Sequence, residues 1–322
     1  MKISLFTFIM IVTTIVCHAQ IYHVQDMSTT EITLLDKEKT VVLLPGGMLE
    51  EHGPYLPSFS DGYLNEDMTN SIANTIVKKL GMKVLIFPII PLGNGGANEI
   101  GTIYTFPGTY SVRQNTLRAL LMDLSSEIGD QGFKKIFVIH MHGSPNHNQA
   151  IDEACAYFND TYSGRMVNVW NLALNFNSDF RTEAEKKEDG FTPHCGAIEH
   201  SMLYYLKPGF TKFKYKTAEP RTAHNPGELA SVAKTTDWPG YWGSPRLASR
   251  AKGEKTWKAL TNFITQQVDN VLDNKFDFSN PTYAEVMNSR PPQKAVNDDA
   301  KKHDKEIEAK QIEWLKIKGL IN

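Results

Sequence analysis

Short, continuous apolar runs alternate along the chain with segments whose apolar residues recur every three to four positions. The runs are rich in β-branched residues, which is typical of strands buried on both faces of a sheet. The intervening segments have the period of an amphipathic helix, and the second of them ends near two glycines, which often terminate helices. The expected strands are 41–44, 83–90 and 135–139, and the expected helices are 66–80 and 112–129.

Strands that alternate with helices in this way indicate a largely parallel sheet covered by helices, so the expected fold class is α/β. Two longer segments show neither pattern. Residues 176–193 are polar and charged, and residues 219–245 are rich in proline, glycine and tryptophan. Loops of this length are uncommon in compact domains unless they serve a functional site. No repeat or flexible linker divides the sequence between residues 20 and 290, so we expect one large domain there.

The C-terminal segment, residues 291–322, differs from this domain because it is rich in lysine and glutamate. From residue 298 onward its few apolar residues have helical spacing, which predicts an amphipathic helix. We expect a charged helical extension that is solvated and docks on the body of the protein. The apolar residues of the helix are Ile307, Ile312, Trp314, Leu315 and Ile317.

Residues 1–19 have the parts of a secretory signal peptide: Lys2, an apolar core, and a small residue before the expected cleavage site at Ala19. The apolar core is about a dozen residues long, whereas a membrane span needs about 20. The alternative is that this segment is not cleaved and remains as an N-terminal membrane anchor. Cys17 would be the lipidated residue of a lipoprotein signal, but the side chains of the Ile-Val pair before it are larger than lipidation sites normally tolerate. We therefore expect export, to the periplasm or the medium, and no membrane contact after cleavage.

Composition narrows the range of partners. The formal net charge of the 322 residues is −2, which argues against nucleic acid or an anionic membrane surface as the main partner. Of three cysteines, Cys155 and Cys195 lie outside the signal segment. Two cysteines do not make a disulfide scaffold, so two buried free thiols are the simpler expectation and one bridge is the alternative.

The first cluster of metal-binding residue types follows the first predicted strand. Glu50 and His52 are two positions apart, so in extended backbone their side chains point to the same side. Gly-Pro and Leu-Pro pairs then bend the chain enough for Asp61 to return toward them. Carboxylate and imidazole are ligands that Zn²⁺ and Mn²⁺ prefer. A chance occurrence in a surface loop is the alternative for this segment taken alone.

Two further clusters lie downstream. His140 and His142 follow the third predicted strand, and the carboxyl ends of parallel strands are where ligands gather. His194, Glu199 and His200 lie at the expected start of a helix that includes residues 202–206. One such histidine would usually be structural, but three clusters together indicate a metal site.

These clusters belong to five segments that, in this order, resemble the creatininase (creatinine amidohydrolase) family. The resemblance covers about residues 30–270 and is specific because all five blocks occur in family order. The segments are Glu50–Asp61 (Glu-x-His-Gly-Pro-x-Leu-Pro with an Asp nine after the His), Phe106–Ser111 (Phe-Pro-Gly-Thr-x-Ser), His142–Asn146, His194–Ser201 (His-x-Gly-x-x-Glu-x-Ser) and Gly240–Gly253.

The resemblance implies a three-layer α/β/α sandwich and a hydrolase of carbon–nitrogen bonds other than ordinary peptide bonds, in which two divalent ions, zinc or manganese, activate water. It makes Asp61 a ligand that bridges both ions and His194 the catalytic residue that transfers a proton. It also suggests a homo-oligomer, with six copies in a ring. The implied metal ligands are Glu50, His52, Asp61, His142 and Glu199, and the implied supporting or substrate-binding residues are His140, Gly108, Thr109 and Asn146.

The sequence departs from the family pattern in three places. His140 and Met141 replace the usual Asn-Gly before the metal-site histidine. Ser144 stands where creatinine hydrolases carry a glutamate, so Glu199 is expected to complete the second metal. An enlarged segment, residues 94–105, replaces a Glu-His pair. This last change and the expected export both argue against creatinine itself as the substrate.

The leading hypothesis is therefore an exported, metal-dependent amidohydrolase acting on a small amide, lactam or short peptide. Creatinine hydrolysis proper is one alternative. A non-catalytic metal- or ligand-binding protein on the same fold is the other. The presence of every ligand type together with His194 favours an enzyme, because a binding protein needs no group for acid–base catalysis.

Overall fold

The computed structural model describes residues 20–322, so the predicted signal peptide lies outside the described residues. At its centre is a five-stranded sheet with the order β1–β3–β2–β4–β5. Every pair of neighbouring strands is parallel, which confirms the predicted sheet. The strands are β1 (Ile21–His23), β2 (Thr40–Pro45), β3 (Lys83–Ile86), β4 (Lys135–Ile139) and β5 (Arg165–Asn168).

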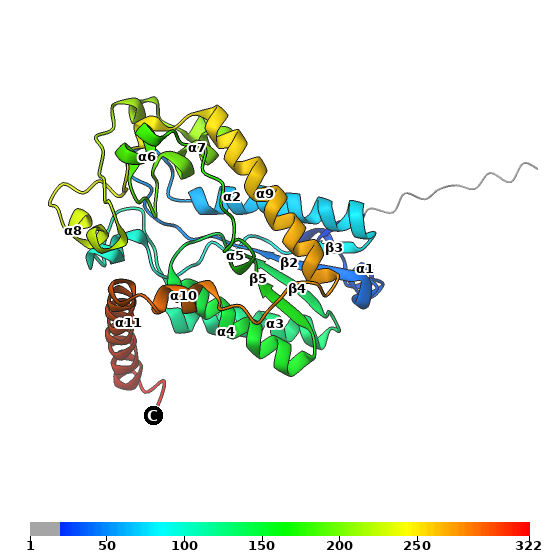
Figure 1. Cartoon of the computed structure of the whole chain (residues 1–322). Coiled ribbons are helices and arrows are strands. Elements are labelled where there is room, and N and C mark those ends of the chain that lie inside the picture. Colours follow the sequence, from blue (N-terminus) through cyan, green and yellow to red (C-terminus); the bar gives the residue numbers. More distant parts are fainter. Residues whose placement is uncertain (1–19) are drawn as a thin grey trace, which may run out of the picture.

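Helices cover both faces of this sheet, which confirms the three-layer α/β/α sandwich (Figure 1). One layer contains α2 (Ser60–Thr75), α7 (Ala197–Leu206) and α9 (Arg250–Leu272), and the other contains α3 (Gln114–Asp130) and α4 (Pro145–Tyr162). The remaining helices are α1 (Thr29–Thr33), α5 (Val169–Leu172), α6 (Glu183–Asp189), α8 (Leu229–Ala233), α10 (Tyr283–Asn288) and α11 (Pro291–Ile317).

The central strand β2 shows why its sequence is continuously apolar. Successive side chains of a strand point to opposite faces of the sheet. Val41 and Leu43 pack in the core beneath α2 and α9, whereas Val42 and Leu44 pack in the core beneath α3 and α4. All four are fully buried, and each contributes about 1.5–3 kcal/mol relative to an exposed side chain.

Several predicted boundaries were wrong for physical reasons. The strand expected over 83–90 ends at Ile86, because Pro88 cannot donate to a neighbouring strand. The helix expected from residue 66 begins at Ser60 and continues beyond Thr75 as a π-helical turn. Asp61 therefore lies in the first turn of α2 and not in the preceding loop. The strands β1 and β5 were missed because three or four residues show no measurable period.

The two segments without a regular pattern are largely irregular, although α6 and α8 interrupt them. Residues from both segments, among them Phe176, Phe191 and Pro226, line the cavity described below. Their length is therefore explained by a role in building the site.

The C-terminal extension is helical, as predicted, and α11 begins at Pro291. It docks on the body mainly through its first half, where Asn297 and Ala300 are buried, and Glu308 in the second half forms an ion pair with Arg113. The second half extends away from the body (Figure 1), and Trp314 and Ile317 are exposed. Trp314 and Ile317 therefore remain outside the docking contact.

Both remaining cysteines, Cys155 and Cys195, are buried and free, which confirms the simpler of the two expectations. Within residues 20–322, none of the helices combines the length and the apolar character that crossing a bilayer requires.

Candidate metal centre

The predicted ligands converge at the carboxyl end of the parallel sheet. Glu50 and His52 lie in the loop that follows β2, and His142 lies in the loop that follows β4. Asp61 and Glu199 lie in the first turns of α2 and α7, respectively. A helix N-terminus favours a nearby negative charge, so both carboxylates occupy positions that stabilise their ionised forms.

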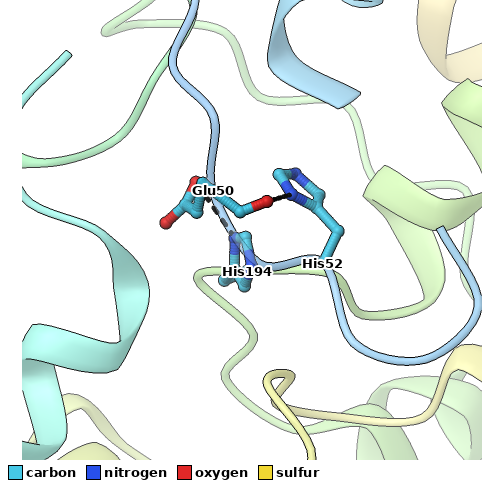
Figure 2. Close-up of side chains that lie close together, drawn as sticks. All are labelled: Glu50, His52 and His194. Carbon is cyan, nitrogen blue, oxygen red and sulfur yellow. Dashed lines mark hydrogen bonds and ion pairs between the residues drawn. The ribbon is translucent and has the colours of Figure 1, made fainter. Parts of the chain in front are cut away.

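The side chains of these residues form three overlapping groups in which one ligand atom per residue lies within 4.8 Å of the others. Asp61 belongs to two of the groups, as a bridging carboxylate would. The groups are Glu50–Asp61–His142, His52–Asp61–Glu199 and Glu50–His52–His194. Figure 2 shows the third group, in which the carbonyl of Glu50 contacts His52 and its carboxylate contacts His194. His194 is thus placed within reach of a cation as well as of a substrate.

Each of the three imidazoles is oriented by a backbone carbonyl. His52 Nδ1 lies 3.1 Å from the carbonyl oxygen of Glu50. His142 Nε2 lies 3.0 Å from that of Gly95, and His194 Nε2 lies 2.5 Å from that of Glu51. A carbonyl can only accept a hydrogen bond, so in each neutral ring this nitrogen carries the proton. The other nitrogen then offers a lone pair, as a metal ligand must.

These free nitrogens face the carboxylates. His52 Nε2 lies 3.4 Å from both Asp61 and Glu199. His142 Nδ1 lies 3.0 Å from Asp61 and 3.2 Å from Glu50. His194 Nδ1 is more distant, at 3.7 Å from Glu50 and 3.9 Å from Glu199. The two sets that share Asp61 are therefore the tighter ones.

Backbone amides hold the carboxylates in turn. The Ala97 N–H donates to Glu50 Oε1 at 2.5 Å, and the Cys195 N–H donates to Glu199 Oε2 at 2.5 Å. Glu50 Oε2 and His52 Nε2 are buried and have no hydrogen-bond partner within residues 20–322. Buried polar atoms are rarely left unsatisfied, so a cation between these groups would explain both. The donor set of carboxylates and imidazoles fits Zn²⁺ or Mn²⁺.

The charges of the cluster are strongly coupled. Burial by itself lowers the pKa of His142, but the carboxylates of Glu50 and Asp61 raise it to well above its usual range. Burial also lowers the pKa of His52, and Asp61 and Glu199 likewise raise it overall. Burial raises the pKa of Asp61, yet the neighbouring imidazoles of His142 and His52 leave it lowered. Without a cation, therefore, protons on the imidazoles balance the buried carboxylates.

Metal binding should consequently release protons. The two imidazoles keep their protons at pH values above the ordinary histidine pKa of about 6.5. A cation must displace these protons, so the affinity for the cation should fall as the pH is lowered. Titration calorimetry with Zn²⁺ or Mn²⁺, in buffers of different ionisation enthalpy at one pH, measures the release. Equal heats in all buffers would contradict this protonation state.

The side chain of His140 does not make the hydrogen bond to His142 or to a carboxylate that was expected of it. Both its ring nitrogens are buried without a hydrogen-bond partner among the described residues. The ring instead fills the space next to Gly46, where any Cβ would clash with it. Burial, followed by the charge of His142, lowers the pKa of His140 to about 4, so its ring is neutral. His140 supports the loop by packing.

Replacing His140 by asparagine should therefore leave metal content unchanged. The smaller side chain leaves part of a buried space empty, which is expected to lower the free energy of unfolding by about 1–3 kcal/mol. Elemental analysis and urea unfolding measure the two effects. Complete loss of metal from the His140→Asn variant would instead make His140 a ligand.

Thr109 and Gly108 act through Glu51, a residue that the sequence analysis did not single out. The Thr109 hydroxyl donates to the Glu51 carboxylate and accepts from the Glu51 N–H at 3.1 Å. Gly108 has a φ of +99° and lies close to Ser58 and Glu51, which leaves little room for a side chain. Glu51 in turn provides the carbonyl that orients His194. Neither Thr109 nor Gly108 lines the cavity.

Other groups that hold the ligands were also missed. The carbonyl of Gly95 and the amide of Ala97 belong to the enlarged segment 94–105, which was expected only to touch substrate. Backbone groups have no signature in residue type, so nothing in the sequence could identify them. Asn146 lies at the cavity, where its side chain donates to the carbonyl of Asn297 at 3.0 Å.

A cavity of about 650 Å³ opens over the cluster. Glu50, Asp61, His142, His194 and Glu199 all line it, whereas His52 lies behind them. Its volume is within the usual range of small-molecule sites, and most of the rest of its lining is apolar.

Comparison with known proteins points to one family. The family model described as creatinine amidohydrolase matches residues 25–268. The chain is 24% identical over 265 residues to a mycofactocin precursor peptide peptidase of Mycolicibacterium smegmatis, covering 78% of this chain and 93% of the relative. It is 25% identical over 227 residues to the creatinine amidohydrolase of Pseudomonas putida, covering 66% and 83%.

A solved structure described as creatininase with manganese has the same fold. It superposes with a TM-score of 0.57 and 21% identity, over 77% of this chain and 98% of that one.

Proposed function

The chain belongs to the creatininase family, and from this premise we propose that it hydrolyses the carbon–nitrogen bond of a small amide, lactam or short peptide with the help of two divalent cations. One observation carries the proposal: the Asp61 carboxylate contacts both His52 and His142, each of which belongs to a different ligand set. A carboxylate shared in this way suits a pair of ions better than a single one.

In this proposal Glu50, Asp61 and His142 hold one cation, and His52, Asp61 and Glu199 hold the other. When bound, the cations would polarise the amide carbonyl and lower the pKa of the attacking water. Zinc and manganese both suit the donor set, and the choice between them is left to metal analysis.

His194 is proposed to move the proton. Its Nε2–H donates to the carbonyl of Glu51, which fixes the ring and leaves Nδ1 free on the side of Glu50 and Glu199. Since His194 lines the cavity, Nδ1 can accept a proton there and pass it to the leaving nitrogen. Glu51 is a further buried acid beside it: burial, and then the charge of Glu50, raise the pKa of Glu51 to about 7.

The size and lining of the cavity favour a substrate larger than creatinine. The walls include Trp170, Phe176 and Phe191, which offer apolar surface well beyond the ligand cluster. The Mycolicibacterium smegmatis relative is a peptidase and the Pseudomonas putida relative acts on creatinine, so the family accommodates substrates of different size. We therefore place N-acyl amino acids and short peptides before creatinine as candidates.

Activity assays on the metal-loaded protein test the proposed function. The panel contains creatinine, hydantoins, lactams, formamides, N-acyl amino acids and dipeptides, each also tested after chelation. Hydrolysis that chelator abolishes and added metal restores supports the proposal. A protein that binds two equivalents of metal but cleaves no member of the panel would support a binding protein on the same fold.

We also propose that residues 1–19 are removed on export, on the basis of their sequence pattern alone. Protein isolated from its native host should then begin at Gln20. Mass spectrometry of the intact chain measures this. A chain that retains Met1 would contradict the proposal.

A homo-oligomer is a further proposal, and only the family resemblance supports it. Light scattering on the metal-loaded protein gives the mass directly. A monomer at micromolar concentration would rule out the ring of six.

A further inference from the structure

The C-terminal extension contributes to the cavity although it lies outside the family match. The match ends at residue 268, and α10 and α11 follow it. Residues of both helices nevertheless line the same cavity as His194 and Glu199. In Figure 1, α10 lies against the body beside α4, and α11 continues from it. The site of this chain therefore includes a wall that the family domain alone does not provide.

Two hydrogen bonds fix this wall beside His142, one to the loop after β4 and one to the first turn of α4. The Tyr283 hydroxyl donates to the carbonyl of Gly143 at 2.7 Å, next to His142. The Asn146 side chain donates to the carbonyl of Asn297 at 3.0 Å. The position of the extension is thus tied to that of the ligand loop.

The extension also holds the enlarged segment 94–105. The Tyr104 hydroxyl donates to Asp299 at 2.5 Å, and its ring stacks on His303 with the centroids 3.9 Å apart. Asp304 accepts from the backbone N–H of Gln114 at 2.8 Å. Since segment 94–105 provides the groups that orient Glu50 and His142, the extension is part of the architecture of the site.

Besides apolar and neutral polar side chains, the wall carries one cation. Val286, Met287 and Val296 line the cavity from this side, together with Arg290. Arg290 is the one arginine or lysine among the described residues that line the cavity, and within residues 20–322 no ion pair involves it. Burial raises the pKa of Tyr283 to about 12, and the positive charge of Arg290 opposes this rise.

We propose that the extension completes the substrate site and that Arg290 binds a carboxylate of the substrate. Guanidinium groups bind carboxylates through paired hydrogen bonds. The other charged residues of the lining are acids and histidines, most of them in the cluster proposed to hold cations. The substrate class that fits is an amide with an apolar group and a free carboxylate, such as an N-acyl amino acid or a short peptide. This inference rests on the proposed function.

The specificity test compares two substrates that differ only in charge, an N-acyl amino acid and its carboxamide. In the Arg290→Gln variant the ratio of kcat/KM for the carboxylate to that for the carboxamide should fall about tenfold, as expected for loss of one charge-assisted hydrogen bond at an exposed arginine. The matched control is Lys294→Gln, which removes the same charge from an exposed part of α11 that does not line the cavity. An unchanged ratio in Arg290→Gln would overturn the inference.

A binding measurement separates this inference from the proposed function. Titration calorimetry compares 4-phenylbutyrate with 4-phenylbutyramide on the metal-loaded wild type and on Arg290→Gln. A preference for the carboxylate that falls about tenfold in the variant supports the anion site even if no amide is cleaved. If the wild type and the variant prefer the carboxylate to the same extent, the preference comes from the metal ions. That result overturns the inference, whether or not amides are cleaved.

Discussion

Replacing Asp61 by asparagine is expected to remove metal from both positions and to abolish metal-dependent hydrolysis. The Asp61 carboxylate is buried at the start of α2, 3.0 Å from His142 Nδ1 and 3.4 Å from His52 Nε2. It is the acid common to the two tighter ligand sets. Asparagine has nearly the same shape but no charge, so the loss can be assigned to coordination and not to packing.

Elemental analysis after dialysis and amide hydrolysis are the two measurements. Glu66→Gln is the matched control, because it removes one acidic charge from an exposed position of the same helix. His52→Ala should differ from Asp61→Asn by sparing one cation, since the set of Glu50, Asp61 and His142 remains complete. Two equivalents of metal in Asp61→Asn would refute the bridging assignment.

Replacing His194 by alanine is expected to leave both cations bound and to lower kcat by a factor of about 10²–10⁴, the usual contribution of a general acid or base. Its Nδ1 is the most distant of the three free imidazole nitrogens from the carboxylates, at 3.7 and 3.9 Å. It also lines the cavity, which His52 does not. Both observations favour proton transfer over coordination.

Metal content decides between the two roles of His194. Loss of one cation from His194→Ala would assign it as a ligand in the group with Glu50 and His52. Normal turnover with full metal would remove it from the mechanism. His224→Ala, at an exposed position, controls for the loss of a histidine. Substrates with poor leaving groups should show the largest decrease, because they depend most on protonation of the leaving nitrogen.

The central part of the fold was predictable because β2 and β4 are buried on both faces and therefore continuously apolar. The residues that gather in the cluster were predictable because their residue types recur in family order. Asp61 was expected in the cluster for the wrong reason. It reaches the cluster because α2 begins at Ser60, and not because the preceding loop bends back. A helix start with no side-chain cap, as here at Phe59, has no clear sequence signal.

The contribution of α10 and α11 to the site could not be predicted from their sequence. A helical pattern shows that one face is more apolar than the other, but not which surface that face covers. In α11 the residues that dock are Asn297 and Ala300, whereas the more apolar stripe near Trp314 remains exposed. Two of the hydrogen bonds that attach the extension end on backbone carbonyls, which leave no trace in residue type.

The ligand cluster joins parts of the chain that are far apart, from Glu50 to Glu199, in a protein whose cysteines Cys155 and Cys195 form no cross-link. Cations held there would close two long loops at once and so act as reversible cross-links. The long-range contacts must form before such a cross-link can be made, so bound metal should slow unfolding more than it speeds folding. Amide hydrogens around α2 and α7 should then exchange more slowly when metal is bound, and resistance to proteolysis should follow metal supply.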